Sequence, residues 1–329
     1  MFSRKHATRP IHWLVPVLLL TASTGPIAAQ ENYPDRAIKI VVPLPPGPFA
    51  DALPRLIANK LSARWRQPII VENKAGFASN LGAAFVARAN PDGYTLLATP
   101  PGPLVVSQHL YPKLDFDPTQ FVPVSVMAEL PYTLVVNPKV LSVSNLQQLI
   151  ALAKASPGKL TFASAGIGSP PHLTAEMLMS AAAIRMSHVP YKGLAPAMTD
   201  LLAGNVDLMF DNLANTLPQI KSGRLRAIAV SDKKRIPELP DVPAIAEVYP
   251  GFYSAGWYAI VAPPKTNAAI AKKLSAAIAD TLRLPDVADR LMRFAARPVG
   301  SSPEQTAAFF KEESARWREV IKAARIAVQ

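Results

Sequence analysis

The sequence predicts an α/β protein built from two lobes with a cleft between them. Short β-branched runs alternate with helical stretches, which is the pattern of parallel sheets covered by helices on both faces. These runs fall into two arrays of similar size, at residues 33–128 and 132–230. The chain has 329 residues, half of them hydrophobic, and is therefore long enough to form two domains.

The expected strands are short runs rich in Val, Ile, Leu and Tyr. They cover residues 37–43, 68–73, 94–99, 132–138, 159–164, 187–191, 206–210, 225–231 and 257–263.

The expected helices lie between these strands. In "DALPRLIANKLSARW" apolar residues recur at helical spacing on one face, at Leu53, Leu56, Ile57 and Leu61. Ser144 is the expected N-cap of a helix over residues 145–156, and Ser302 is the expected start of a last helix over residues 302–325.

The part of the chain after residue 232 contains one strand and three helices, which is too little to stand alone. We therefore place it on the first array. The chain then crosses between lobes near residues 128–134 and 229–235, giving a first lobe of residues 30–131 and 233–329 and a second lobe of residues 132–232. Two crossings form a hinge, and small ligands bind in clefts between domains, at the carboxyl ends of parallel strands.

The first 29 residues have the order of a secretory signal peptide. Arg4, Lys5 and Arg9 precede the apolar run "IHWLVPVLLL", and small residues follow, ending in "PIAAQ". The apolar run is shorter than the roughly 20 residues that span a bilayer. We expect cleavage after Ala29 and a mature chain that resides in the periplasm.

The charge and the cysteine count exclude several classes of protein. There is no cysteine, so disulfides and thiolate metal sites are not available. Loss of the three cations of the signal peptide lowers the net charge from +12 to +9. The Lys and Arg residues are spread along the chain, and the densest run, "SDKKR" at 231–235, is typical of a solvated loop, so we expect no nucleic-acid partner.

Catalytic and cofactor motifs are each incomplete. "FASAG" has Phe162 where a nucleophile elbow requires its first glycine. The five histidines form no metal-ligand pair, "GIGSPP" lacks the third glycine of a dinucleotide fingerprint, and no phosphate-binding loop occurs. We therefore expect no enzyme activity, no cofactor and no metal. A secreted serine hydrolase that uses Ser164 or Ser169 with His172 remains the alternative.

Four loops of small residues each connect the end of a strand to the start of a helix, at residues 43–51, 73–82, 98–103 and 163–173. Glycines let the backbone approach a ligand, and the free N–H groups and dipole of a helix N-terminus favour negative charge. Ordinary βα connections have a similar composition. The joint occurrence of four such loops favours a site for a carboxylate.

Seven stretches in succession resemble signatures of one family of extracytoplasmic solute receptors, the Bug-type, TctC-like receptors of tripartite tricarboxylate transporters. They are "YPDRAIKIVVPLPPG", "QPIIVENKAG", "NPDGYTLLAT", "LTFASAGIGSPPHLTAEM", "HVPYKGLAPAMTDLLAGNVDLMFDN", "GRLRAIAVSDKKR" and "LPDVPAIAEV". The resemblance implies a monomeric, two-lobed periplasmic-binding-protein fold of type II, with two parallel or mixed sheets, that closes on a small carboxylate. It also implies delivery to membrane permease subunits, or service as an orphan sensor for a two-component system.

The first loop departs from the family pattern of Pro-Gly-Gly, a variable residue and then Ser or Thr before Asp. Here Pro48 replaces a glycine and Ala50 replaces the hydroxyl residue, next to Gly47 and Phe49. These changes remove one backbone donor and one hydroxyl, so we expect the usual ligand to bind less well. Pro54 is compatible with the first turn of a helix, where N–H groups lack intrahelical partners.

The second loop usually reads Pro-Gly-Ala-Gly-Gly, and here Phe77, Ala78 and Ser79 follow Ala75 and Gly76. Phe49 and Phe77 either face the cleft or pack inside the lobe. Our hypothesis is a carboxylate with an apolar or aromatic body.

The second lobe keeps more of the expected pattern. Ser164, Gly168 and Ser169 precede a helix that begins near His172, and their polar groups suit a carboxylate, whereas His172 either contacts the ligand or packs at the helix start. Tyr191 is expected to form a wall of the cleft or a contact made when the lobes close. Asp211 either accepts a ligand amino or hydroxyl group or caps the next helix. The candidate ligand-binding residues are Leu44, Gly47, Pro48, Phe49, Ala50, Phe77, Ala78, Ser79, Thr99, Ser164, Gly168, Ser169, His172, Tyr191 and Asp211.

Overall fold

The computed structural model of the chain describes residues 1–2, 33–46 and 49–326. Residues 3–29 of the expected signal peptide, with the cleavage point, and the loop residues Gly47 and Pro48 lie outside the described residues. The chain divides into two units, residues 1–33 and 34–329. All the elements below belong to the second unit.

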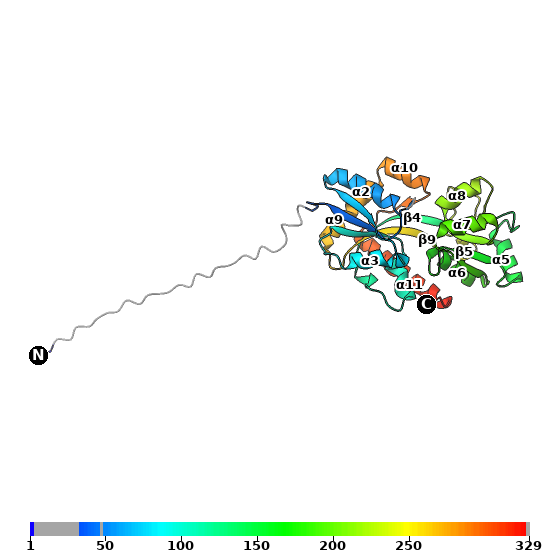
Figure 1. Cartoon of the computed structure of the whole chain (residues 1–329), viewed down its shortest axis with the longest axis horizontal. Helices are drawn as coiled ribbons and strands as arrows, with labels where there is room; N and C mark the ends of the chain where they lie inside the picture. The colour runs from blue at the N-terminus through cyan, green and yellow to red at the C-terminus, as the bar shows by residue number, and fades with distance from the viewer. Residues whose placement is uncertain (3–32, 47–48, 327–329) are drawn as a thin grey trace. The chain divides into compact units, whose positions relative to one another are not determined.

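The described strands form one hydrogen-bonded sheet, which contains both arrays and in which β4 pairs with several partners. The order is β2-β1-β3-β9-β4-β7-β5-β6, and β8 and β10 also pair with β4. The bounds are β1 Ile38–Val42, β2 Ile69–Asn73, β3 Thr95–Thr99, β4 Val122–Val136, β5 Thr161–Ser164, β6 Ser187–Pro190, β7 Leu208–Asn212, β8 Arg226–Val230, β9 Ala255–Ala262 and β10 Arg297–Pro298. Strands β1, β2 and β3 run parallel, as do β5, β6 and β7, whereas β9 is antiparallel to β3 and β4. The expected α/β fold with two parallel or mixed strand arrays is confirmed (Figure 1).

Strand β4 joins the two arrays. Its first part, through Pro131, pairs with β9, and its second part, from Tyr132, pairs with β7 and β8. Only the second part was predicted from the sequence, and prolines in the interior of a run usually argue against a strand. Here Pro123 lies beside a register shift in the ladder, where an irregularity tolerates the missing N–H group.

The expected helices are present. Their bounds are α2 Ala52–Trp65, α3 Asn80–Ala87, α4 Ser107–Leu110, α5 Leu146–Ala155, α6 Pro170–Ala182, α7 Leu194–Ala203, α8 Leu213–Lys221, α9 Ala268–Leu282, α10 Pro285–Arg293 and α11 Pro303–Ala323. Ser302 caps α11 as predicted, through its side chain and the Gln305 N–H group. The prediction of Ser144 as the cap of α5 is wrong: the Asn145 side chain accepts the Gln148 N–H group, and Ser144 bonds the Gln148 side chain instead.

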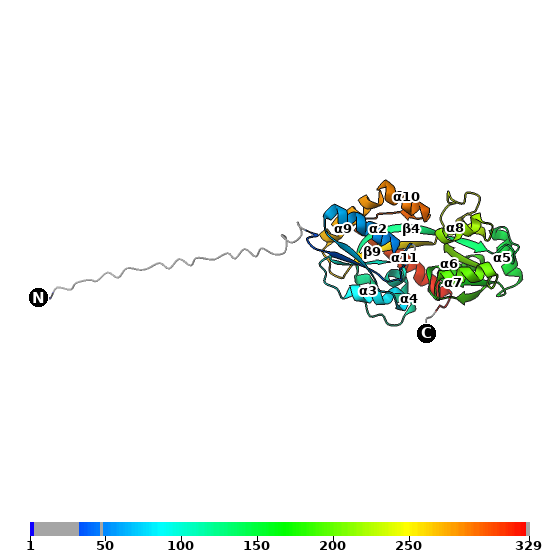
Figure 2. The same ribbon diagram turned by 45° about the horizontal axis from the view of Figure 1, so that its top comes forward.

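The last three helices contact elements of the first array, and α11 also contacts α6. Helix α9 contacts α2 and β4, and α11 contacts β4. Figures 1 and 2 show α2, α9 and α10 grouped together, whereas α5, α6, α7 and α8 surround the second array. A close approach fixes α3 against the first array, because a Cβ atom added at Gly82 would lie 2.8 Å from the Pro43 Cβ and 2.9 Å from the Lys74 carbonyl oxygen.

Two large core clusters lie in this unit. One includes Val41, Leu97, Trp257 and Trp317 of the first array and α11. The other covers the second array, from Tyr132 onward, and it also contains Ile245 and Phe252. We therefore propose that the second lobe extends to about residue 254, beyond the expected end at residue 232.

The segments that connect the two arrays are held together by hydrogen bonds. The Ser231 N–H group donates to the Tyr132 carbonyl at 2.9 Å, and the Ser254 N–H group donates to the Ser231 carbonyl at 2.9 Å. The Ser254 hydroxyl lies 2.6 Å from the Thr174 hydroxyl of α6. These buried contacts tie both crossings of the chain to one another and to the start of α6.

Candidate functional site

Asn73 organises the first loop, at the end of β1. Its amide Nδ2 donates to the Leu44 carbonyl and to Asp51 Oδ1, each at 2.9 Å. The Arg55 Nε donates to Asp51 Oδ2 at 2.8 Å, and this bond lowers the pKa of Asp51. The loop is thus fixed by a buried carboxylate, and the carbonyl of the candidate residue Leu44 is occupied by Asn73.

Phe49 packs against two aromatic side chains of the first lobe. Its side chain is 9% exposed, and the rings of Tyr258 and Phe294 each lie 5.3 Å from its ring, edge to face. Of the two alternatives for Phe49, facing the cleft or packing inside the lobe, the structure favours packing. The neighbouring residue Ala50 is half-buried. Pro54 is buried in the first turn of α2, as expected.

The second loop has an unusual backbone. Phe77, Ala78 and Ser79 have φ angles of 47°, 50° and 74°, a left-handed region that favours glycine. Phe77 is 60% exposed, and its ring lies 5.0 Å from that of Tyr111. Of the two candidate phenylalanines, Phe77 is thus the one open to solvent.

Asn80, the first residue of α3, is a polar residue that the sequence analysis missed. It is 2% exposed, yet neither its Oδ1 nor its Nδ2 has a hydrogen-bond partner within the protein. Buried amides are nearly always paired. An asparagine that follows a loop of small residues is the only signal that the sequence offered. The nearby candidate Thr99, at the end of β3, is buried and donates to the Pro100 carbonyl.

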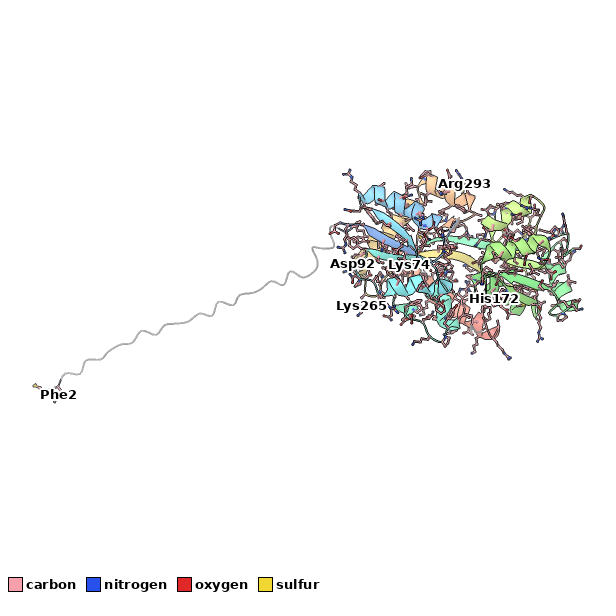
Figure 3. The ribbon with its side chains drawn as sticks, viewed as in Figure 1. Phe2, Lys74, Asp92, His172, Lys265 and Arg293 are labelled. Atoms are coloured by element: carbon pink, nitrogen blue, oxygen red, sulfur yellow. The ribbon has the colours of Figure 1, made fainter. Side chains whose placement is uncertain are left out.

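The loop after β5 is built around two stacked histidines. The His172 and His188 rings lie 3.9 Å apart, and His172 stands in the first turn of α6 (Figure 3). The Ser164 Oγ lies 2.6 Å from His188 Nε2 and accepts the Gly166 N–H group. Burial, with a smaller contribution from His172, lowers the pKa of His188 to about 4.

The geometry of His172 differs from that required by the hydrolase alternative. Its Nδ1 accepts the Gly168 N–H group at 3.0 Å, and its Nε2 lies 3.4 Å from Glu176 Oε1. The histidine beside Ser164 is instead His188, which lies on the neighbouring strand β6. The proposed pairing of Ser164 or Ser169 with His172 is therefore wrong.

The Tyr191 hydroxyl has a hydrogen-bond partner, whereas one carboxylate oxygen of Asp211 has none within the protein. The Tyr191 hydroxyl donates to Asp200 at 2.6 Å. Asp211 is fully buried; its Oδ1 accepts the Asn212 N–H group and the Asn215 amide, and its Oδ2 has no partner. The residue at the N-cap position of α8 is Asn212 rather than Asp211. Burial raises the pKa of Asp211 to about 7.

The loops of the two arrays meet at Gly168 and Leu110. A Cβ atom at Gly168 would lie 2.2 Å from Leu110 Cδ1 of α4, so the loop after β5 lies against the segment that follows β3. On the other side of that segment, a Cβ atom at Gly102 would lie 3.7 Å from the Ala78 carbonyl oxygen. The structure thus brings the second, third and fourth candidate loops into one neighbourhood.

Residues 53–326 match the model of a family described as the tripartite tricarboxylate transporter family receptor. The chain belongs to this family. Three solved structures are similar to the receptor over most of its length. Rpa4515 of R. palustris with adipate is 35% identical, with a TM-score of 0.81, over 90% of this chain and 100% of that one.

The periplasmic binding protein BugD is 34% identical, with a TM-score of 0.77, over 90% of this chain and 100% of that one. MatC of Rhodopseudomonas palustris with bound malate is 32% identical, with a TM-score of 0.76, over 88% and 100%. The resemblance to Bug-type receptors and the expected periplasmic-binding-protein fold are confirmed.

Four residues of the receptor share one property. Each has at least one buried side-chain polar atom without a hydrogen-bond partner within the protein. These residues are Asn80, Thr133, Ser169 and Asp211. Asn80 and Ser169 lie at helix starts, Asp211 lies near the end of β7, and Thr133 lies inside β4. Thr133 lies directly opposite Asp211 on the neighbouring strand, so both side chains project to the same face. Such atoms cost free energy unless a partner binds them. Elsewhere among the described residues, only Gln219 and Arg316 have such atoms.

The described residues show neither a metal cluster nor a membrane span. No group of three or more His, Cys, Asp or Glu side chains among them is placed to hold a metal ion. Within the same residues, every helix is too short or too polar to cross a membrane.

Ala78→Gly is expected to raise the free energy of unfolding by about 0.5–1 kcal/mol, because glycine relieves the left-handed strain at that position. Ala75→Gly is the matched control, because Ala75 is exposed in the same loop and is not among the described residues with positive φ. It is expected to lower stability slightly through unfolded-state entropy. Urea unfolding measures the free energy of unfolding of both variants. An equal decrease in the two variants would show that the backbone at Ala78 is not strained.

Gly168→Ala is expected to lower the free energy of unfolding by about 1–2 kcal/mol more than Gly158→Ala. Both glycines have φ near 75°, at 74° and 77°, but a Cβ atom at Gly158 meets nothing within 4 Å. The extra loss comes from Leu110, so the double variant with Leu110→Ala should be less destabilised than the sum of the single variants. If urea unfolding gives additive losses of free energy, the added methyl group at position 168 does not contact Leu110, and the prediction is wrong.

Proposed function

We propose that this receptor captures a small carboxylate between the loops of its two arrays and closes on it. The observation that carries the proposal is the set of unpaired buried polar atoms at Asn80, Thr133, Ser169 and Asp211. The first of these residues belongs to the first array and the others to the second. A ligand that supplies partners to both sets favours the closed form, because it adds interactions that the open form lacks.

The carboxylate class is supported by the ligands of two similar structures. Rpa4515 holds adipate and MatC holds malate, and both are over 30% identical to this chain. Carboxylates suit hydroxyl and amide donors, which Ser169 and Asn80 offer, whereas Pro170 and Pro171 leave the first two positions of α6 without N–H groups. The same loop is held by the hydrogen bond between Ser164 and His188 and by the one that the Gly168 N–H group donates to His172 Nδ1.

The body of the ligand is proposed to be apolar or aromatic. Pro48 and Ala50 lack a donor and a hydroxyl that the family pattern supplies, which disfavours polyhydroxylated and tricarboxylic acids. Phe77 is exposed beside Tyr111 and offers an aromatic surface to such a body.

The cellular role that we propose follows the family. The receptor is exported to the periplasm, its signal peptide is cleaved after Ala29, and it acts as a monomer that passes its ligand to the permease subunits of a tripartite tricarboxylate transporter. It is not an enzyme, because binding and release suffice for this role. Its lobes are residues 30–131 with the end of the chain, and residues 132 to about 254.

A thermal-shift panel tests the ligand class. The exported protein is unfolded and refolded to remove any copurified ligand, then heated with adipate, malate, phenylacetate, acidic amino acids and citrate. An acid at about 100 times its dissociation constant adds roughly 2.7 kcal/mol to the free energy of unfolding. We expect adipate or phenylacetate to stabilise the protein more than citrate. Stronger stabilisation by citrate would refute the apolar body, and no stabilisation by any acid would refute the carboxylate class.

A further inference from the structure

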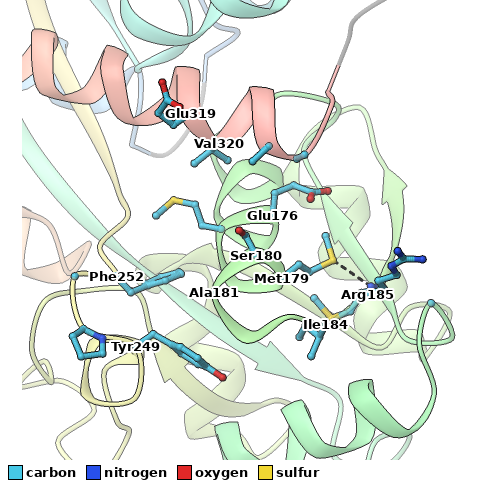
Figure 4. Close-up of a pocket in the computed structure, with 17 residues that line it drawn as sticks. Glu176, Met179, Ser180, Ala181, Ile184, Arg185, Tyr249, Phe252, Glu319 and Val320 are labelled. Carbon is cyan, nitrogen blue, oxygen red and sulfur yellow. Dashed lines mark hydrogen bonds between the residues drawn. The ribbon is translucent and has the colours of Figure 1, made fainter.

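A hollow with a volume of about 820 Å³ lies between α6, the loop at residues 249–252 and the last turns of α11. It is separate from the candidate loops, because none of the proposed carboxylate-binding residues lines it. Figure 4 shows Glu319 and Val320 on the α11 side of the hollow, with Tyr249 and Phe252 on another side. Small-molecule sites typically have volumes of about 300–1,000 Å³.

The lining of the hollow combines apolar groups with an excess of negative charge. Sulfur and aromatic side chains dominate the apolar part, at Met177, Met179, Met186, Tyr249 and Phe252. The charged side chains of the lining are Glu176, Glu319 and Arg185. The whole chain is basic, with a net charge of +12, so an acidic lining does not simply follow the composition. The Glu176 carboxylate would repel a carboxylate ligand and attract a cation.

Glu176 is the carboxylate that is better placed to hold a charged group. Its side chain is 18% exposed, whereas Glu319 is 67% exposed and pairs with Arg318. The partial burial of Glu176 reduces solvent screening, so an ion pair formed there is stronger than one at the surface. Aromatic faces and thioether sulfurs also suit an apolar body that carries a cation.

Glu176 is also connected to the loop of the proposed carboxylate site. The Gly168 N–H group donates to His172 Nδ1, and the other ring nitrogen, Nε2, faces Glu176 Oε1 at 3.4 Å. A cation that draws the Glu176 carboxylate into the hollow removes this partner from His172. A cation in the hollow would therefore change the hydrogen bond between His172 and the Gly168 N–H group.

We propose that the hollow is a second binding site, for an organic cation with an apolar body, and that the Glu176 carboxylate is its charged anchor. This proposal does not rest on the proposed carboxylate function, so each can fail without the other.

The test uses three probes that share one body and differ in charge: phenethylammonium, phenethyl alcohol and phenylacetate. Titration calorimetry of the exported protein should give one saturable site for phenethylammonium, bound roughly tenfold or more tighter than the alcohol. Equal binding of the two, or no binding of the cation, would overturn the proposal. Phenylacetate reports on the proposed carboxylate site instead.

Three variants locate the binding. Glu176→Gln keeps the size of the side chain and should weaken phenethylammonium roughly tenfold, whereas Glu238→Gln removes an exposed charge outside the hollow and should leave it unchanged. Ser180→Trp fills the hollow from an exposed position and should abolish cation binding without affecting phenylacetate. Cation binding that survives Glu176→Gln or Ser180→Trp would overturn the assignment.

The connection to the loop has its own readout. The amide signal of Gly168 in a ¹⁵N-correlated spectrum should shift when phenethylammonium saturates the wild-type protein, and it should not shift in Glu176→Gln. A Gly168 signal that stays in place at saturation would refute the connection through His172.

Discussion

Replacing Glu313 with alanine is expected to lower the free energy of unfolding by about 3–5 kcal/mol. The Glu313 carboxylate is 3% exposed and accepts the indole N–H groups of Trp257 at 2.9 Å and Trp317 at 3.2 Å. It also forms an ion pair with Arg316. Burial raises the pKa of Glu313, although Arg316 and the two indoles act in the opposite direction. Alanine leaves three donors without an acceptor in a buried site and so loosens α11 from β9.

The neighbouring variants separate this network from general effects. Glu313→Gln keeps one acceptor oxygen and is expected to lose only part of that free energy. Glu312→Ala removes an exposed glutamate one position away and is expected to change stability by less than about 0.5 kcal/mol. Urea unfolding measures all three variants. A loss for Glu313→Ala no larger than that for Glu312→Ala would contradict the network.

Asp211 is expected to make the receptor less stable as the pH rises. Burial raises its pKa in the folded state to about 7, above its value of about 3.9 in an unfolded chain. Between these two values the folded state binds a proton that the unfolded state has released, so the free energy of unfolding falls as the pH rises through this range. The full change from Asp211 is at most about 4 kcal/mol. Asp211→Asn removes it, and the variant should be more stable than the wild type above pH 7.

Unfolding curves of the wild type and Asp211→Asn at several pH values check this prediction. Asp200 provides a control of opposite sign, because its hydrogen bond from Tyr191 lowers its pKa. A lowered pKa contributes stability that is lost as the pH falls, so Asp200→Asn should matter least at low pH. A stability difference between the wild type and Asp211→Asn that is independent of pH would show that Asp211 is charged throughout.

The fold was largely predictable because its strands and helices follow local periodicity. The runs that became β1, β2, β3 and β5 are bounded by turn residues, and α11 begins at a Ser302 capping box. The first part of β4 was missed because Pro123 and Pro131 oppose a strand locally, and only its pairing with β9 overrides them. The packing of Ile245 and Phe252 in the second core likewise depends on tertiary contacts, which no local sequence pattern predicts.

The candidate site was predictable at the level of loops but not of atoms. Glycines and helix starts identified the loops around residues 77 and 168. The pairing of Ser164 with His188 was not predicted, because β5 and β6 bring the two together across 24 positions of sequence. The unpaired atoms of Asn80 and Thr133 depend on what surrounds them after folding, and composition gives no indication of that.

Titration calorimetry of adipate into the refolded exported protein tests the central claim most directly. We predict one saturable site per chain, with weaker binding in Gly168→Ala, because that change displaces the loop where the two arrays meet. Binding that Gly168→Ala leaves unchanged would contradict the proposed location. If neither adipate, malate, phenylacetate nor citrate gives saturable heat, the proposal that this receptor binds carboxylates is wrong.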